Sequence, residues 1–405
     1  MSPTEAAPPQ DALAPARLGP LELRNRVLKA ATFEGMCPGG LVSDELIAFH
    51  EAVAAGGVGM STVAYCAVSP EGRTQADQLH WRPEVLPGLR RLTDAVHAAG
   101  AKVSAQIGHA GPVADSSSTG LRALSASRVF GPQALAFARA ADERDLERVI
   151  AAHASAARMA RDVGFDAVEL HFGHNYLVSS FLSPALNRRR DGWGGSLENR
   201  SRLARRIAEA VRREVGSSLA LLAKINMDDG VRGGVVPAES LPFAQLLEAD
   251  GQLDALELTG GSSLKNPLYL FKGEVPLKEM AQSQGGFLGL GVRLFGRVLL
   301  KSYPYQPLYF LETARAFRAA LNMPLVLLGG ITDVDALDTA MREGFDFVAM
   351  ARALLREPDL LKRMAADRAT RSRCTHCNRC MATIFKGTFC PLIDEARDEE
   401  RGAAR

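Results

Sequence analysis

Two histidines and a tyrosine stand close together near the middle of the chain. His171 and His174 are separated by two residues, and Tyr176 follows two positions later. They come at the end of an apolar run, residues 167–172, that predicts a buried strand. Because all three side chains can donate a hydrogen bond, such a cluster could polarise a carbonyl oxygen and then deliver a proton. The alternative is that both histidines are structural and that Tyr176 only packs.

The elements that must position this cluster alternate regularly along the sequence. The chain has 405 residues, 47% of them hydrophobic, and can therefore bury a large core. Eight short apolar or β-branched runs predict strands at residues 27–32, 60–65, 102–107, 167–172, 219–226, 255–259, 324–331 and 347–353. Amphipathic patterns predict helices at residues 44–55, 82–99, 143–163, 197–215, 239–249, 311–321, 333–342 and 359–366. Eight alternations of strand and helix predict an α/β fold, a closed (β/α)8 TIM barrel.

Two connections are too long to be simple turns. The first spans residues 108–142 and is rich in Gly, Ser and Pro, while the second spans residues 260–309, follows the sixth strand and carries several aromatic residues. Long loops after barrel strands lie at the catalytic face, so the second is expected to form a lid or subdomain over the site. Subunit contacts in a homo-oligomer are the alternative. The expected divisions are a disordered tail (1–16), the barrel (17–370) and a cysteine-rich C-terminal extension (371–405).

Charge and hydropathy exclude several classes of partner. The chain carries 48 Lys and Arg residues against 46 Asp and Glu residues, a formal net charge of +2, so no basic field for nucleic acid is implied. No apolar run reaches the length of about 18 residues that would predict a membrane span. Residues 1–17 lack the positive start and apolar middle of a signal peptide. The expectation is a cytoplasmic protein that acts on a small molecule.

The stretch from His171 to Arg200 also carries a longer pattern. It reads His-x-x-His-x-Tyr-Leu, then Phe-Leu-Ser-Pro, then Asn-x-Arg-x-Asp-x-Trp-Gly-Gly-Ser-x-Glu-Asn-Arg. This pattern resembles, nearly residue for residue, the signature of the Old Yellow Enzyme family of FMN-dependent ene-reductases. The resemblance implies a flavin-binding barrel that takes its electrons from NADH or NADPH, and it leaves open which of the two.

Residues at the predicted strand ends fit the flat ring of a flavin. Ala31, Thr32 and Ala64 are small and leave room across the barrel mouth, and the Gln106 amide can both donate and accept hydrogen bonds. Lys224 lies within an apolar run, where a buried lysine needs an anionic neighbour or stabilises negative charge on a ligand. The resemblance implies that Thr32 and Gln106 contact the flavin. It also implies that Lys224 lies near the flavin N1 edge, where many family members have arginine.

The last two strand ends suit a phosphate group. Gly329 and Gly330 follow the seventh strand, and Ala351 and Arg352 follow the eighth. The loops after the last two strands of such a barrel often bind phosphate through backbone N–H groups, and a nearby guanidinium can clamp the dianion. The resemblance implies that these four residues hold the FMN phosphate, although family members usually have glycine where this chain has Ala351.

The resemblance also assigns roles to the central cluster. His171 and His174 would hydrogen-bond the carbonyl oxygen of an α,β-unsaturated carbonyl compound, and Tyr176 would protonate its α-carbon after hydride transfer. Two alternatives remain within this interpretation. One is a relative of the family that acts on an amine, a steroid or an acyl thioester. The other is a flavin or iron–sulfur electron-transfer protein.

Four of the six cysteines crowd near the C-terminus. Cys374, Cys377, Cys380 and Cys390 are separated by two, two and nine residues. Closely spaced thiolates with a distant fourth suit a tetrahedral zinc or a [4Fe–4S] cluster. The spacing resembles the cluster motif of the branch that contains the bacterial 2,4-dienoyl-CoA reductases, but its second and third gaps are shorter. A cluster, zinc and unligated thiols all remain open.

Overall fold

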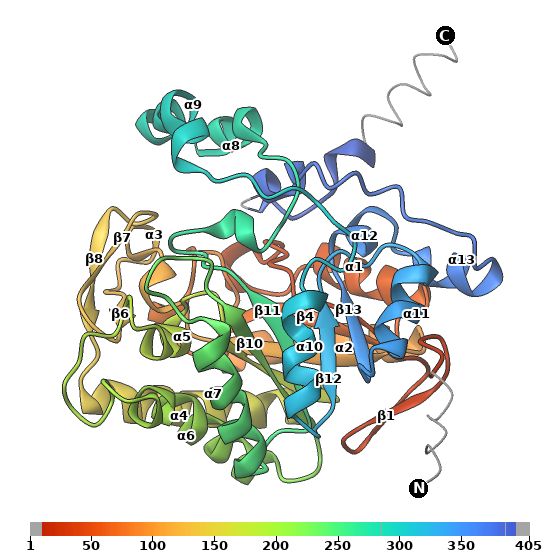
Figure 1. Ribbon diagram of the computed structural model, residues 1–405, viewed down its shortest axis with the longest axis horizontal. Helices are drawn as coiled ribbons and strands as arrows, with labels where there is room; N and C mark the ends of the chain where they lie inside the picture. The colour runs from red at the N-terminus through yellow and green to blue at the C-terminus, as the bar shows by residue number, and fades with distance from the viewer. Residues whose placement is uncertain (1–9, 285, 385, 394–405) are drawn as a thin grey trace, which may run out of the picture.

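Eight parallel strands close into a barrel in the computed structural model, which describes residues 10–284, 286–384 and 386–393 (Figure 1). Around the barrel the strands follow the order β10-β11-β12-β13-β3-β4-β5-β9, which confirms the predicted α/β barrel. Their bounds are β3 Val27–Lys29, β4 Met60–Ala67, β5 Lys102–Gly108, β9 Ala167–Phe172, β10 Ala220–Asp228, β11 Ala255–Gly260, β12 Leu325–Leu328 and β13 Phe347–Met350. Nearly every strand residue is buried, as expected when helices cover the outside of a parallel sheet.

Helices cover the outside of the barrel near the predicted positions. They are α1 Asp44–Ala55, α2 Leu86–Ala98, α4 Glu143–Asp162, α6 Leu197–Val215, α7 Pro237–Asp250, α10 Leu311–Ala320, α11 Val334–Arg342 and α13 Leu360–Ala366. Local chemistry explains two of the starts. The Ser43 side chain accepts the backbone N–H of Leu46 at the start of α1, and Asp142 and Asp145 form a capping box at the start of α4.

Three predicted strands extend beyond the observed ones. β3, β12 and β13 each end three residues early, because the chain leaves the sheet to form the barrel mouth. After β12, Gly329 and Gly330 adopt positive φ values of 106° and 76°, a conformation that favours glycine. After β13, the short helix α12 Arg352–Arg356 begins almost at once.

A hairpin closes the amino end of the barrel. Strands β1 Ala16–Leu18 and β2 Leu21–Leu23 pair antiparallel, and their three leucines are buried against the lower interior of the barrel. Residues 1–9 of the expected tail lie outside the described residues. Ala12, by contrast, is buried, and its carbonyl accepts the N–H of Arg26 at 2.9 Å. The described part of the segment that was expected to be a disordered tail therefore packs against the barrel.

The two long connections contain secondary structure of their own. Residues 108–142 include the short helix α3 Ser116–Thr119 and a three-stranded sheet of β6 Leu124–Ser125, β7 Val129–Gly131 and β8 Ala136–Ala140, which the sequence pattern did not predict. Residues 260–309 include helices α8 Leu277–Gln284 and α9 Gly286–Leu299, which project from the body of the molecule (Figure 1).

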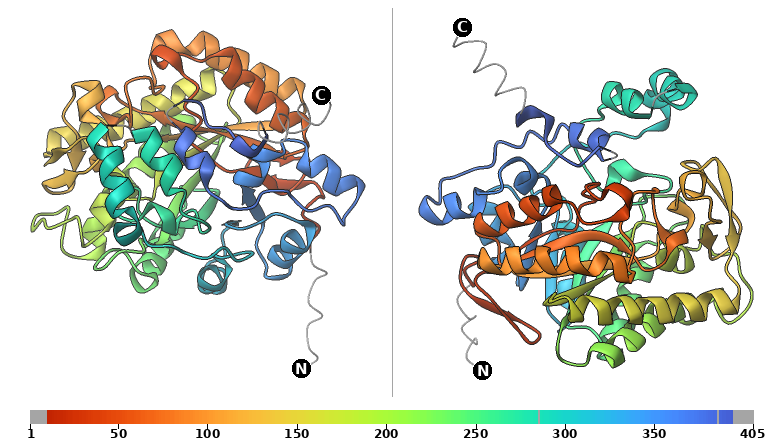
Figure 2. Two further views of the ribbon diagram at one scale, coloured as in Figure 1. Left: turned by 90° about the horizontal axis from the view of Figure 1, so that it is seen from above. Right: turned by 180° about the vertical axis from the view of Figure 1, so that it is seen from behind.

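The C-terminal extension lies beside the α8–α9 insertion (Figure 2). The N–H of Glu274 donates to the carbonyl of His376 at 3.1 Å, and the rings of Tyr305 and His376 stack with centroids 3.4 Å apart. The N–H of Thr388 reaches back to the carbonyl of Glu34 after β3, at 2.6 Å. The extension therefore lies over the barrel mouth, and its residues 394–405 fall outside the described part. Within the described part, no helix combines the length and apolarity that a membrane crossing needs.

Candidate active site

The predicted cluster assembles at the carboxyl end of the barrel. His171 ends β9, and Tyr176 directly precedes helix α5 Leu177–Leu182. The ring centroids of His171 and His174 lie 4.9 Å apart, those of His171 and Tyr176 lie 4.4 Å apart, and Tyr65 from β4 adds a third aromatic contact at 5.3 Å from Tyr176. A tight turn with positive φ at His174 and Asn175, 61° and 59°, brings the two rings onto one side.

Hydrogen bonds fix this turn and leave one ring nitrogen available. The backbone N–H of His174 donates to Asn226 Oδ1 at 3.0 Å, and its ring Nε2 lies 3.1 Å from Thr259 Oγ1. Nδ1 of His171, in contrast, is buried and has no hydrogen-bond partner in the structure. A buried polar atom without a partner is costly, so this nitrogen is suited to contact a ligand.

Burial keeps the cluster uncharged near neutral pH. Desolvation, together with the neighbouring His174 and the positive charge of Lys224, holds the pKa of His171 well below its usual value. Desolvation and Lys224 lower the pKa of His174 to about 3. Desolvation also raises the pKa of the Tyr176 phenol. At pH 7 the site therefore presents two neutral imidazoles and one protonated phenol, which are hydrogen-bond donors without net charge.

Below this cluster lies a charged layer inside the barrel. Lys224 Nζ on β10 is 2.9 Å from Glu169 Oε1 on β9 and 3.0 Å from Glu257 Oε1 on β11. Gln106 on β5 donates its amide to Glu169 Oε1 at 2.5 Å. All four side chains are at most 4% exposed. The predicted lysine and glutamine are thus brought together, and the lysine has anionic neighbours.

Small residues after β3 and within β4 surround another buried carboxylate. Glu34 accepts the backbone N–H of Ala64 at 2.9 Å and forms an ion pair with Lys29 at 2.5 Å. Thr32 Oγ1 lies 3.4 Å from Glu34 Oε1, and Ala31 packs beside the apolar cluster that includes Ala64. Ala31, Thr32 and Ala64 therefore lie at one side of the barrel mouth.

The residues predicted to bind phosphate line one pocket of about 320 Å³. Its walls include Gly329, Gly330, Ala351 and Arg352. The Arg352 guanidinium also donates to the carbonyl of Phe271 at 2.8 Å and to Asn378 Oδ1. This arginine therefore joins the pocket to the insertion and the C-terminal extension.

The four C-terminal cysteines line a neighbouring pocket of about 310 Å³, whose wall also includes Arg352. Burial raises the pKa of Cys374, and it raises the pKa of Cys380 to about 12. In residues 10–284, 286–384 and 386–393, no three His, Cys, Asp or Glu side chains are arranged to hold a metal ion. The cysteines Cys374, Cys377, Cys380 and Cys390 therefore share a pocket without a formed metal centre.

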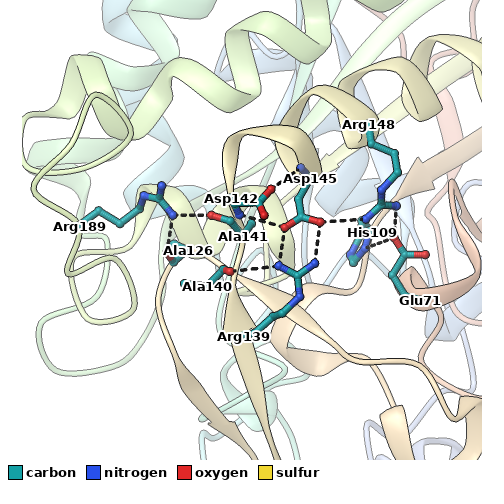
Figure 3. A network of polar contacts seen from close by, with 10 residues as sticks. All are labelled: Glu71, His109, Ala126, Arg139, Ala140, Ala141, Asp142, Asp145, Arg148 and Arg189. Atoms are coloured by element: carbon teal, nitrogen blue, oxygen red, sulfur yellow. Dashed lines mark hydrogen bonds and ion pairs between the residues drawn. The ribbon is translucent and has the colours of Figure 1, made fainter.

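His109, three residues beyond Gln106, belongs to a structural network (Figure 3). Its Nδ1 accepts the N–H of Gly111 at 2.9 Å, and its Nε2 lies 3.7 Å from Glu71. Glu71 also pairs with Arg148, which reaches Asp145 at 3.3 Å. The carbonyl of His109 accepts the N–H of Leu177, next to Tyr176. The network thus anchors the start of α5 and takes no direct part in the cluster.

Several site residues were not predicted from the sequence. They include three buried carboxylates and two residues that contact the cluster, namely Glu34, Glu169, Glu257, Tyr65 and Thr259. Glu169 and Glu257 each interrupt an apolar run, and this is the same signal that singled out Lys224. Tyr65 and Thr259 carry no comparable signal.

The chain belongs to the NADH:flavin oxidoreductase / NADH oxidase family, because residues 12–257 match the sequence profile of that family. The resemblance to Old Yellow Enzyme is thereby confirmed. The chain is 54% identical to the 4,4'-dithiodibutanoate disulfide reductase of Rhodococcus erythropolis over 388 residues, 96% of each chain. It is 31% identical to a metal reductase of Desulforamulus reducens, covering 92% of this chain and 51% of the relative. It thus spans about half the length of that relative.

A solved structure supports the same assignment. The complex of 2-naphthoyl-CoA reductase with 2-naphthoyl-CoA superposes with a TM-score of 0.81 at 26% identity, covering 94% of this chain and 56% of that one. The family implies FMN and NAD(P)H. The observed residues fit FMN, because a pocket lined by Gly329, Gly330 and the guanidinium-bearing Arg352 lies at the carboxyl ends of β12 and β13, where a phosphate group can be held. Gln106 and Lys224 would hold the flavin ring of FMN, and the pocket at Gly329 and Gly330 would hold its phosphate.

Proposed function

We propose that this protein is an FMN-dependent NAD(P)H oxidoreductase that reduces the activated C=C bond of a small α,β-unsaturated carbonyl compound. The observation that carries the proposal is the assembly of His171, His174 and Tyr176 as neutral donors at the barrel mouth. Bound FMN would supply the hydride that it had taken from NAD(P)H. Gln106 and Lys224 would hold the flavin ring, and the pocket at Gly329 and Gly330 would hold its phosphate.

The protein side chains divide the remaining work. His171 and His174 donate hydrogen bonds to the carbonyl oxygen of the substrate, which withdraws electrons from the β-carbon and stabilises the developing oxyanion. Tyr176 then gives its phenolic proton to the α-carbon. Because the pKa of Tyr176 is raised by burial, the phenol holds its proton until the substrate accepts it.

A second substrate class is favoured by one observation, the 54% identity to a disulfide reductase over 96% of both chains. Here the reducible bond would be the S–S bond of a small organic disulfide. The two imidazoles would hydrogen-bond the departing thiolate. A thiol with a pKa near the ordinary value of about 8.5 is partly ionised in mildly alkaline solution. The thiolate can therefore leave the broken S–S bond with little help from a proton donor.

The two classes are separated by one experiment on the reduced holoenzyme. The enzyme is reduced anaerobically and mixed with 2-cyclohexenone or with 4,4'-dithiodibutanoate, while flavin absorbance reports reoxidation. We expect Tyr176→Phe to slow the enone reaction by about 10²-fold or more and to affect the disulfide reaction at pH 8 by less than about tenfold. Tyr303→Phe, outside the cluster, is the matched control. If neither compound reoxidises the flavin, the proposal is wrong.

We also propose that Cys374, Cys377, Cys380 and Cys390 bind a metal, as an iron–sulfur cluster or as zinc. What supports this is their spacing and the single pocket that they line. Iron, zinc and acid-labile sulfide are measured in protein purified without air, and in the Cys377→Ser variant. Less than one metal ion for every two chains in the unmodified protein would overturn the proposal.

A further inference from the structure

The charged layer inside the barrel holds one positive side chain between two carboxyl groups. Lys224 lies within 3.0 Å of both Glu169 and Glu257, and each carboxyl is 1% exposed. With both carboxyls ionised, one positive and two negative charges would leave a net charge of −1. An unbalanced charge that is shielded from water is strongly disfavoured, and two adjacent carboxylates therefore tend to share one proton.

The hydrogen bonds show which carboxyl keeps the proton. Glu169 accepts from both Lys224 and the amide of Gln106, and these bonds stabilise its ionised form. Glu257 lacks the contact with Gln106, and its Oε1, 3.0 Å from Lys224 Nζ, has no hydrogen-bond partner in the structure. Because Glu169 has two neighbours that stabilise its ionised form and Glu257 has one, a proton shared by the two carboxyls belongs on Glu257.

We propose that Glu257 carries a proton in the folded enzyme and that this proton sets how much of the positive charge of Lys224 is available to bound FMN. The proposal rests on FMN binding beside Lys224, which is part of the proposed function. Glu257 acts through Lys224 and is a positioning residue. When Glu257 is neutral, Lys224 balances Glu169 alone. When it ionises, Lys224 is shared by two anions and the layer beneath the flavin becomes negative.

The pKa values of the group agree with this assignment. Burial, reinforced by the charge of Glu169, raises the pKa of Glu257 to about 8. Lys224 and the hydrogen bonds to Glu169 outweigh burial and lower the pKa of Glu169. The pKa of Lys224 is raised by the two carboxyls. Glu257 is therefore the member of the group that changes charge near pH 8.

Among the described residues around Glu257, no second group titrates between pH 7 and 9. On β9, His171 is neutral because its pKa is held far below its usual value. On β12, the residue in register with Glu257 is Val326. On β3, Lys29 interacts with Lys224 and Glu169 but is itself paired with Glu34. A change between pH 7 and 9 is thus assigned to Glu257.

FMN retention by the diluted holoenzyme tests the proposal without measuring turnover. Released flavin is followed by its fluorescence from pH 6.5 to 9.5, which gives the FMN dissociation constant. Since ionised Glu257 adds negative charge below an anionic ligand, we expect FMN binding to weaken by about tenfold between pH 7 and 9. Glu257→Gln, which imitates the protonated form, should hold FMN with less than a twofold change over this range. Glu198→Gln, at an exposed ion pair, should behave as the unmodified protein.

A second measurement does not depend on FMN. Infrared spectra of the full-length protein should show a protonated-carboxyl C=O band at pH 7 that fades above pH 8 and is missing in Glu257→Gln. A band that persists in the variant, or a variant whose FMN release keeps the pH dependence of the unmodified protein, would overturn the proposal. A protein that binds no FMN at any pH would instead refute the proposed function, and the infrared band would still decide the protonation of Glu257.

Discussion

Replacing Lys224 with methionine would leave two carboxyl groups facing each other inside the barrel. The lysine ammonium lies 2.9 Å from Glu169 and 3.0 Å from Glu257, and all three side chains are buried. Breaking a buried ion pair by removing one partner costs about 3–5 kcal/mol of stability, because the remaining charge is uncompensated. We expect Lys224→Met to lose about this much at pH 8, measured by urea unfolding of the FMN-free protein.

The stability of Lys224→Met should depend on pH, and the direction of that dependence follows from the two carboxyl groups. Without the lysine, the pKa of both carboxyls in the folded protein lies above the unfolded value, so the folded state binds more protons and its stability rises as pH falls. The loss should therefore shrink at pH 5, because the two carboxyls of the folded variant then bind protons more fully and carry less uncompensated charge. Lys224→Arg keeps the charge and should lose less than about 1.5 kcal/mol. A loss below about 1 kcal/mol for Lys224→Met at pH 8, or a loss of equal size at pH 5, would refute the charge-balance argument.

Further predictions concern the barrel mouth and the phosphate pocket. Tyr176→Phe should leave the rate of flavin reduction by NAD(P)H within about twofold while slowing enone reduction, as stopped-flow measurements of the two half-reactions would show. Because burial keeps the pKa of His171 and His174 well below the usual value, the rate of flavin reoxidation by the enone should show no imidazole titration between pH 5.5 and 8; a break near pH 6.5 would contradict their neutrality. Arg352→Gln should weaken FMN binding by about 10–100-fold, the size of a lost charge-assisted hydrogen bond. It should leave riboflavin binding unchanged, and Arg356→Gln is the control, since Arg356 lines the cysteine pocket and not the phosphate pocket.

The barrel could be predicted from the sequence because each of its strands lies within or overlaps an apolar run, although three of those runs extend beyond the observed strand. A buried strand of this kind can be predicted from the apolar residue types within the strand itself. The small sheet of β6, β7 and β8 could not be predicted in the same way. Its strands are two to five residues long, and several of their side chains are exposed. Such short strands depend on contacts with their partners and leave no clear periodicity.

The sequence predicted the site residues that stand close together in one motif. It did not predict the residues that are brought together by the pairing of separate strands. His171, His174 and Tyr176 are close in sequence and stay close in space. The partners of Lys224 come from β9 and β11, and they are brought to it by strand register, which pairs Lys224 with Glu257 on β11 and Leu222, two residues before Lys224, with Glu169 on β9. The direction of Arg352 toward Phe271 likewise follows from the fold of the insertion, which the sequence pattern does not specify.

The hairpin of β1 and β2 closes the amino end of the barrel and leaves the carboxyl end as its opening. Leu18, Leu21 and Leu23 fill that end, so a molecule cannot enter or leave through it. Under the proposed function, the reductant and the oxidant would then enter through the same opening, one after the other. For a two-substrate steady-state study this means a ping-pong pattern, in which double-reciprocal plots at several fixed concentrations of one reactant run parallel.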